Sequence, residues 1–320
     1  MDSQIKIIID TDPGIDDAMA IHQAFSDTRL RVMGLTTVFG NVPTTIATRN
    51  ALRLAEMAAY PAPVAHGADK PMKRVPAPPA DFVHGREGFG RVPAAEPLQN
   101  ADPRSACTFL SETIINNPNE ICVCAIGPLT NLAMALERCP EIADLAMSVT
   151  VMGGTVTRPG NVSEYAEANI WGDPDAAEIV FSANWDVTMI GLDVTEQVQC
   201  GPEDFNVIAR SSPRIGGFLN DAVDFYLDFH ESKNLPRKCY MHDPSAVFSV
   251  TDPDLFEYEN LPLEVILTGE ESGRTRVSES LNKKTIRVAT GVNSTSIQEK
   301  FIELLCVADK LADDRHGSIQ

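Results

Sequence analysis

Four aspartates gather in the eight residues from Asp10 to Asp17, within the stretch IIIDTDPGIDDAMAI and directly after an apolar run. They are Asp10, Asp12, Asp16 and Asp17. Like charges at short range resist joint ionisation and burial, so such a cluster needs water, a shared proton or a bound cation. Ca²⁺ and Mg²⁺ prefer carboxylate and carbonyl oxygens, and Ca²⁺ accepts the irregular geometry of a turn. The cluster therefore predicts a cation site, because helix capping would explain Asp16 or Asp17 but not all four residues.

Two later stretches carry groups that could complete such a site. In MHDPSAV, His242 stands beside Asp243 ahead of a proline, which offers a metal-binding carboxylate and an imidazole whose charge depends on it. The same pair also fits a capped helix start. In GNVSEYAEANIW, the side chains of Asn161, Glu167 and Asn169 offer several hydrogen-bonding groups. They suit a polyhydroxylated ligand such as a sugar, and a solvated loop remains an equal alternative.

The elements that must position these groups alternate between strands and helices. Apolar runs and helical spacing predict strands at 5–9, 31–39, 121–126, 147–152 and 187–190, and helices after 17, at 44–59, after 128 and at 174–181. Right-handed crossovers between such strands build a largely parallel sheet, and ligands bind beyond the carboxyl ends of its strands. We therefore predict an α/β fold, a single open, mostly parallel (Rossmann-like) sheet flanked by helices, in one domain over 1–320.

Two segments lie outside this alternating core. The segment 71–97 is rich in proline and glycine and too long for a passive connector, so it is predicted to be a lid-like loop. Short strands are predicted over 262–290, as a peripheral extension of the sheet, before one final helix.

The composition narrows the class of partner. With 26 Lys and Arg against 45 Asp and Glu, the formal charge is -19, which argues against nucleic acid or an anionic membrane as partner. No apolar run approaches the roughly 20 residues that span a bilayer, and no signal peptide is evident, so a cytoplasmic protein is expected. The 7 cysteines lack ligand-like spacing, which indicates neither a zinc site nor a disulfide framework.

The ordered set of motifs resembles one family. DTDPGIDDAMAI, FGNV, HGREGFG, GPLTNLAMALE, VMGGTV, GNVSEYAEANIWGDPDAA and MHDPSAV occur in the order found in the inosine-uridine-preferring nucleoside hydrolases. The resemblance covers most of the chain and implies Ca²⁺-dependent hydrolysis of the N-glycosidic bond of ribonucleosides, which yields ribose and a free purine or pyrimidine base. It also implies a homo-oligomer, a dimer or tetramer, that acts in nucleoside salvage.

The resemblance assigns roles by position. The implied metal ligands are Asp12, Asp17, Asp243 and the backbone carbonyl of Ile126. The implied ribose-binding residues are Asp16, Asn41, Asn161, Glu167 and Asn169. Asp12 would also take a proton from the attacking water, His242 would lie beside the leaving base, and His84 on the lid and His230 would lie near the base. Since neither tryptophan lies on the lid or just before His242, broad or pyrimidine-tolerant use is expected.

Two other hypotheses for the function are compatible with parts of the sequence. A strand followed by DxD also begins haloacid-dehalogenase-like phosphatases, in which Asp10 would be the nucleophile and Asp12 the acid and base around Mg²⁺. The residues that follow here, PGIDD, do not match the continuation of that motif, which argues against the phosphatase hypothesis. A non-catalytic nucleoside or ribose binder on a similar fold is the other alternative.

Overall fold

In the computed structural model, which describes residues 4–280 and 282–319, nine strands form one sheet. The sheet strands are β1 (Ile5–Thr11), β2 (Leu30–Thr37), β3 (Val64–Ala65), β4 (Ile121–Ala125), β5 (Ser148–Met152), β6 (Val187–Ile190), β9 (Phe256–Val265), β10 (Thr275–Val277) and β11 (Thr285–Val292). Their spatial order is β10-β9-β11-β6-β5-β4-β1-β2-β3. All pairs from β11 to β3 are parallel, whereas β9 and β10 are antiparallel at one edge. The predicted open, mostly parallel sheet is confirmed.

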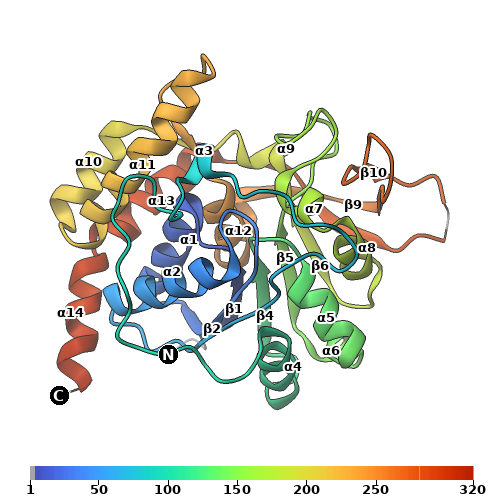
Figure 1. Ribbon diagram of the computed structural model, residues 1–320, viewed down its shortest axis with the longest axis horizontal. Helices are drawn as coiled ribbons and strands as arrows, with labels where there is room; N and C mark the ends of the chain where they lie inside the picture. The colour runs from blue at the N-terminus through green and yellow to red at the C-terminus, as the bar shows by residue number, and fades with distance from the viewer. Residues whose placement is uncertain (1–3, 281, 320) are drawn as a thin grey trace.

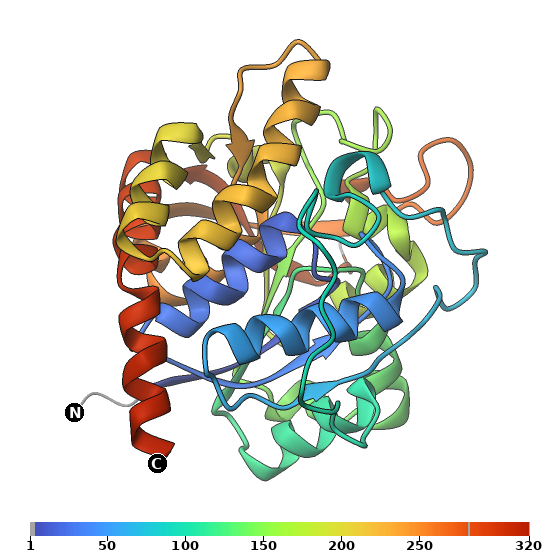
Figure 2. The same ribbon diagram turned by 60° about the vertical axis from the view of Figure 1, so that its left-hand side comes forward.

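The helices cover both faces of this sheet (Figures 1 and 2). They are α1 (Ile15–Ser26), α2 (Thr44–Met57), α3 (Asp81–His84), α4 (Ala106–Asn116), α5 (Thr130–Arg138), α6 (Ile142–Leu145), α7 (Ala168–Gly172), α8 (Pro174–Ser182), α9 (Leu192–Thr195), α10 (Pro202–Ser211), α11 (Ile215–Ser232), α12 (His242–Thr251), α13 (Ser294–Cys306) and α14 (Ala308–Ile319), with a 3₁₀ turn at Pro253–Leu255. One apolar core holds residues of α1, α2 and α9–α14, and the other holds residues of α4–α8.

The central strand β1 shows why the sequence builds two cores. Side chains alternate between the faces of a strand, so Ile7 and Ile9 enter the core under α1 while Ile8 enters the opposite core. All three side chains are fully buried. A strand that is apolar on both faces suits the middle of a parallel sheet covered by helices.

The carboxyl ends of the central strands meet at one level. Asp10 in β1 is in register with Thr36 in β2 and with Ala125 in β4. Strand β1 therefore lies between β2 and β4, where the strand order changes direction, and the turns after these strands converge at the usual place for a ligand site.

Several elements differ from the sequence-based expectation. The single helix expected at the end is two helices, because the backbone at Val307 leaves helical geometry between α13 and α14. No proline or glycine marks this break. The two-residue strands β7 (Gln199–Cys200) and β8 (Cys239–Tyr240) pair with each other, and no sequence pattern predicted them. In the described residues, no helix is both long and apolar enough to cross a membrane.

Candidate active site

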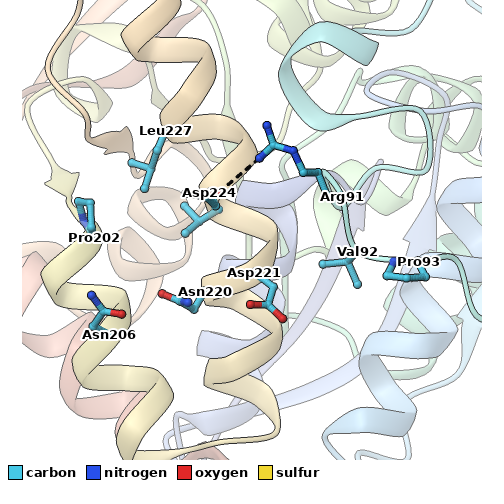
Figure 3. Close-up of a pocket in the computed structure, with 10 residues that line it drawn as sticks. Arg91, Val92, Pro93, Pro202, Asn206, Asn220, Asp221, Asp224 and Leu227 are labelled. Carbon is cyan, nitrogen blue, oxygen red and sulfur yellow. Dashed lines mark hydrogen bonds and ion pairs between the residues drawn. The ribbon is translucent and has the colours of Figure 1, made fainter.

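The predicted substrate-binding residues line one cavity of ≈ 480 Å³. They are Asp16, Asn41, His84, Asn161, Glu167, Asn169 and His230. The same wall includes Ile126, His242 and Asp243. Asp12 and Asp17 do not line it and are buried, with exposures of 1% and 0%. A second hollow of ≈ 520 Å³ lies beside α10 and α11, and none of the predicted site residues line it (Figure 3).

The carboxylate of Asp12 is held in the turn between β1 and α1. Its Oδ2 accepts a hydrogen bond of 2.6 Å from the backbone N–H of Asn41, whereas its buried Oδ1 has no hydrogen-bond partner among the described residues. A Cβ at Gly40 would lie 2.0 Å from Oδ2, and one at Gly127 would lie 2.6 Å from Oδ1. The two glycines of FGNV and GPLT therefore leave just enough room for this carboxylate. Burial and the charge of Asp17 raise the pKa of Asp12 well above its ordinary value.

Asp17 fastens the same turn. Its Oδ1 accepts from the Thr11 hydroxyl at 2.5 Å and the Asp12 N–H at 3.2 Å. Its Oδ2 accepts from the Gly14 N–H at 2.9 Å and the Asn41 side-chain amide at 3.0 Å. The bond to Gly14 closes the amino terminus of α1, so Asp17 does cap the helix, as the simpler interpretation of the motif proposed.

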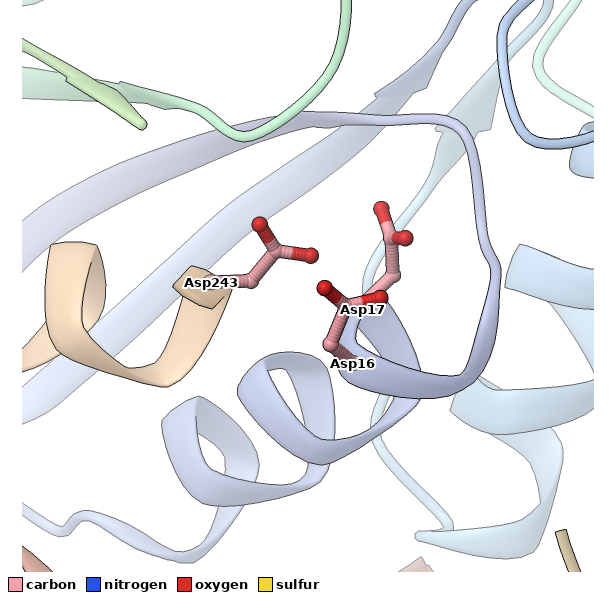
Figure 4. A group of neighbouring side chains, drawn as sticks. All are labelled: Asp16, Asp17 and Asp243. Carbon is pink, nitrogen blue, oxygen red and sulfur yellow. The ribbon is translucent and has the colours of Figure 1, made fainter. Parts of the chain in front are cut away.

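Three carboxylates converge beside the cavity, and two of them line it. Asp16, Asp17 and Asp243 each offer one oxygen, and these oxygens lie within 4.8 Å of one another (Figure 4). Asp16 and Asp17 begin α1 and Asp243 lies in the first turn of α12, so two helix amino termini bring the charges together. Burial raises the pKa of Asp16 to about 6, and burial and the Asp16 charge raise the pKa of Asp17 to about 6. Burial also raises the pKa of Asp243 well above its ordinary value.

These observations fit a bound cation. The buried Oδ1 atoms of Asp12 and Asp16 have no hydrogen-bond partner among the described residues, and like charges this close need compensation. The set consists of oxygen donors, which suits Ca²⁺ or Mg²⁺ rather than a soft metal. Asp12, which the family resemblance assigned to the metal, is absent from the converging trio, and its Oδ2 accepts from the N–H of Asn41.

The polar residues between β5 and the first turn of α7 have structural partners as well as exposure to the cavity. Glu167 accepts from the N–H groups of Gly154 at 2.9 Å, Asn169 at 2.9 Å and Ile170 at 3.1 Å. Burial raises its pKa to about 7. The Asn169 amide donates to the carbonyl of Ile126 at 3.1 Å, which joins this loop to the turn after β4. These contacts fix the polar wall before any ligand is bound.

Two histidines of the cavity wall, His84 and His242, are held by hydrogen bonds at Nδ1. The Nδ1 of His84 accepts from the Ile15 N–H at 3.2 Å and lies 3.8 Å from Asp16 Oδ1. The Nδ1 of His242 shares a hydrogen bond of 2.8 Å with the Thr195 hydroxyl. Burial lowers the pKa of His84 to about 4 and that of His242 to about 3.

A row of aromatic rings forms the other end of the cavity. Tyr226 and His230 are 4.8 Å apart, His230 and Tyr240 are 4.7 Å apart, and Tyr240 and His242 are 5.5 Å apart, centre to centre. All four line the cavity. Sequence reasoning missed Tyr226, Tyr240 and Phe229, although Tyr226, Phe229 and His230 share the i, i+3, i+4 spacing of one helix face, which was the available signal.

The comparisons with known proteins identify the family. The model of the inosine-uridine preferring nucleoside hydrolases matches residues 7–299. The chain belongs to this family. It is 41% identical over 279 residues to uridine nucleosidase 1 of Arabidopsis thaliana, an alignment that covers 87% of this chain and 83% of the relative. This protein is accordingly a hydrolase that acts on ribonucleosides, and the phosphatase alternative is not favoured.

Solved structures of nucleoside hydrolases agree with this assignment. A purine-preferring ribonucleoside hydrolase from Gardnerella vaginalis superposes with a TM-score of 0.91 at 33% identity, covering 95% of this chain and 99% of the other. A plant nucleoside hydrolase superposes with a TM-score of 0.89 at 35% identity, covering 94% of this chain and 98% of the other.

Proposed function

We propose that this nucleoside hydrolase cleaves the N-glycosidic bond of ribonucleosides in a Ca²⁺-dependent reaction in which Asp12 activates the attacking water. The observation that carries the proposal is the buried Asp12 Oδ1, which has no hydrogen-bond partner among the described residues. The backbone N–H of the same residue donates to Asp17, one of three converging carboxylates. A carboxylate oxygen free to accept a proton is what a general base requires.

The residues that would hold the cation offer only oxygen. They are Asp12, Asp17, Asp243 and the carbonyl of Ile126. Ca²⁺ is preferred to Mg²⁺ because a turn and two helix ends supply irregular geometry, whereas Mg²⁺ requires near-ideal octahedral geometry. When bound, the cation would supply Lewis acidity that lowers the pKa of water and an anchor for hydroxyl groups.

Asp12 would accept the proton of the attacking water at Oδ1. The N–H of Asn41 holds Oδ2 at 2.6 Å, so the other oxygen keeps a constant direction. Gly40 and Gly127 admit the carboxylate at distances that no side chain would allow. The backbone of two separate turns thus prepares the base for proton transfer.

The polar wall would bind the ribose through Asp16, Asn41, Asn161, Glu167 and Asn169. Cleavage of a C–N glycosidic bond passes through an oxocarbenium-like centre, which nearby carboxylates stabilise. Asp16 and Glu167 are the two carboxylates of this set, and both are buried, with exposures of 7% and 2%. Their low-dielectric surroundings strengthen the attraction to a developing positive charge.

The aromatic end would hold the base. His242 would assist its departure: if the Thr195 hydroxyl donates to Nδ1, the Nε2–H is left to donate to the leaving base. His84 and His230 would contact the base from the lid side and from α11. Broad use of bases that includes pyrimidines is proposed, since similar proteins include both a uridine nucleosidase and a purine-preferring hydrolase. The expected homo-oligomer, cytoplasmic location and role in salvage stay predictions.

The test of the Ca²⁺ assignment is removal and return of the cation. Protein stripped with a chelator and dialysed should release no base from inosine or uridine, and Ca²⁺ should restore the release better than Mg²⁺. Calorimetry should show one Ca²⁺ bound to the wild type and much weaker binding to Asp243→Asn. Full activity of the stripped protein, with no Ca²⁺ bound, would refute the cation dependence.

A further inference from the structure

Asn50 in α2 touches two segments that meet at the active site. Its side-chain amide donates to the carbonyl of Pro13 at 3.1 Å and to the carbonyl of Glu87 at 2.8 Å. Pro13 follows Asp12 in the acidic turn, and Glu87 lies in the HGREGFG segment, 84–90. The Asn50 residue is 1% exposed; its bond to Pro13 is buried and its bond to Glu87 is partly buried.

Gly88 packs closely against this amide. Gly88 has φ +90°, and a Cβ there would lie 2.7 Å from the Asn50 amide nitrogen and 2.7 Å from the Pro13 carbonyl oxygen. No residue larger than glycine fits between the turn and the segment. Phe89, the next residue, is 1% exposed and belongs to the core beneath α1 and α11. The HGREGFG segment is thus joined to the interior, unlike the exposed part of the predicted lid before it.

Other contacts of this segment are weaker. Arg49 pairs with the Glu87 carboxylate at 2.7 Å, but the Glu87 side chain is 37% exposed. Arg91, which directly follows the segment, reaches Asp224 of α11 at 3.3 Å (Figure 3). It also reaches Asp228 at 2.6 Å, and its side chain is 58% exposed. Exposed ion pairs contribute little, whereas buried hydrogen bonds to backbone carbonyls are costly to lose. The hydrogen bonds of Asn50 are therefore the best candidates for holding the HGREGFG segment against the acidic turn.

We propose that Asn50 is a positioning residue that sets the distance between the acidic turn and His84, and so presents His84 to the base of the substrate. The proposal rests on the proposed function for the role of His84. The connection is short: His84 begins the segment, its carbonyl accepts from the N–H of Gly90 at 2.7 Å, and its Nδ1 accepts from Ile15 just beyond the turn. Loss of the Asn50 bonds loosens the segment at one end and the turn at the other.

Hydrogen exchange tests the positioning directly. In Asn50→Ala, the amides of Gly88 and Gly90 should exchange about tenfold faster or more than in wild type, because the segment loses its side-chain bond at the Glu87 carbonyl. Glu87→Ala is the matched control: it removes the Arg49 ion pair in the same segment and keeps the carbonyl that Asn50 bonds. Exchange in Asn50→Ala within about twofold of this control would overturn the proposal.

A double-mutant cycle tests the route through His84. Asn50→Ala should lower kcat/KM by about tenfold or more in wild type, mostly through KM, and by no more than about twofold in a His84→Ala background. Equal losses in both backgrounds would overturn the role assigned to Asn50. A purely structural role would lower the melting temperature and leave the cycle additive.

A second variant and a separate reading of the exchange data cover two possible failures of these tests. If Asn50→Ala does not fold, Asn50→Ser shortens the same side chain and should show the same exchange pattern. If the wild type releases no base, the proposed function fails while the exchange comparison still decides whether Asn50 fixes the segment. The two failures are therefore distinguishable.

Discussion

Replacement of Gly127 by alanine should move the proposed base without removing any polar group. A Cβ there would lie 2.6 Å from Asp12 Oδ1 and 2.9 Å from Val38, whereas ordinary contact begins at 3.4 Å. The carboxylate must retreat by roughly 0.8 Å, and a misplacement of about 1 Å can cost on the order of 100-fold in rate. We expect kcat/KM to fall roughly 10- to 100-fold, which corresponds to about 1.4 to 2.7 kcal/mol of lost transition-state stabilisation.

The assay is steady-state release of base from uridine and inosine, with thermal unfolding measured in parallel. Gly217→Ala is the control, because Gly217 lies in α11 with no heavy atom within 4 Å of the added Cβ. Alanine is favoured over glycine in a helix by about 0.5–1 kcal/mol, so this control should keep its activity and its stability. A folded Gly127→Ala protein with kcat/KM within about twofold of wild type would refute the claim that the position of Asp12 limits the reaction.

Three further predictions address proton transfer and acid sensitivity. Asp12→Asn should lower kcat by orders of magnitude while nucleoside binding persists in part, and unchanged turnover would contradict its role as base. His242→Ala should harm natural nucleosides far more than an activated aryl riboside, whereas equal losses would argue against help to the leaving base. Burial lowers the pKa of His22 from 6.5 to about 3, so the unfolded chain binds its proton first as the pH falls. The free energy of unfolding that His22 contributes above its ordinary pKa of 6.5 is therefore lost as the pH falls below it. The loss is about 2 kcal/mol at pH 5 relative to pH 7. Denaturant unfolding should show that the free energy of unfolding of His22→Leu lacks this decrease between pH 7 and pH 5. If the difference in unfolding free energy between the variant and wild type does not change with pH, the role of His22 is contradicted.

The strand ends could be predicted, because the spacing of apolar residues indicates where a strand ends and a helix begins. The apolar run of β1 and the helical spacing after Asp17 predicted a turn at a sheet edge, and the register of β1 with β2 and β4 confirms that the turns converge. Position along the chain was enough for this inference. The same reasoning failed at Val307, where no residue type signals the break between α13 and α14.

The direction of side chains was not predictable from the pattern. Asp12 accepts from the N–H of Asn41, and Asp16 rather than Asp12 joins Asp17 and Asp243 in the converging trio. This choice depends on contacts between residues far apart in sequence. The fit of the Asp12 carboxylate against two glycine backbones is another such contact.

The residues that contact the recognised motifs could not be predicted from the sequence either. Asn50 sits in a helix whose composition indicates only an amphipathic surface, and its two bonds cross 37 residues each. Tyr240 belongs to the two-residue strand β8, which is too short for any periodic signal, and β8 pairs with β7. Its ring lies against those of His230 and His242. Residues that act through tertiary contacts thus emerge only in the fold.

The most direct test of the central claim is a product assay on the wild-type protein. Inosine, uridine, their 2′-deoxy counterparts and uridine monophosphate would be incubated with and without a chelator, and free base, ribose and phosphate would be measured. The proposed function predicts free base and ribose from the ribonucleosides, little from the deoxy compounds, and none once the chelator is present. Intact ribonucleosides, together with calorimetric evidence that they bind, would contradict hydrolysis and favour a binder; release of phosphate from uridine monophosphate instead of base would favour a phosphatase.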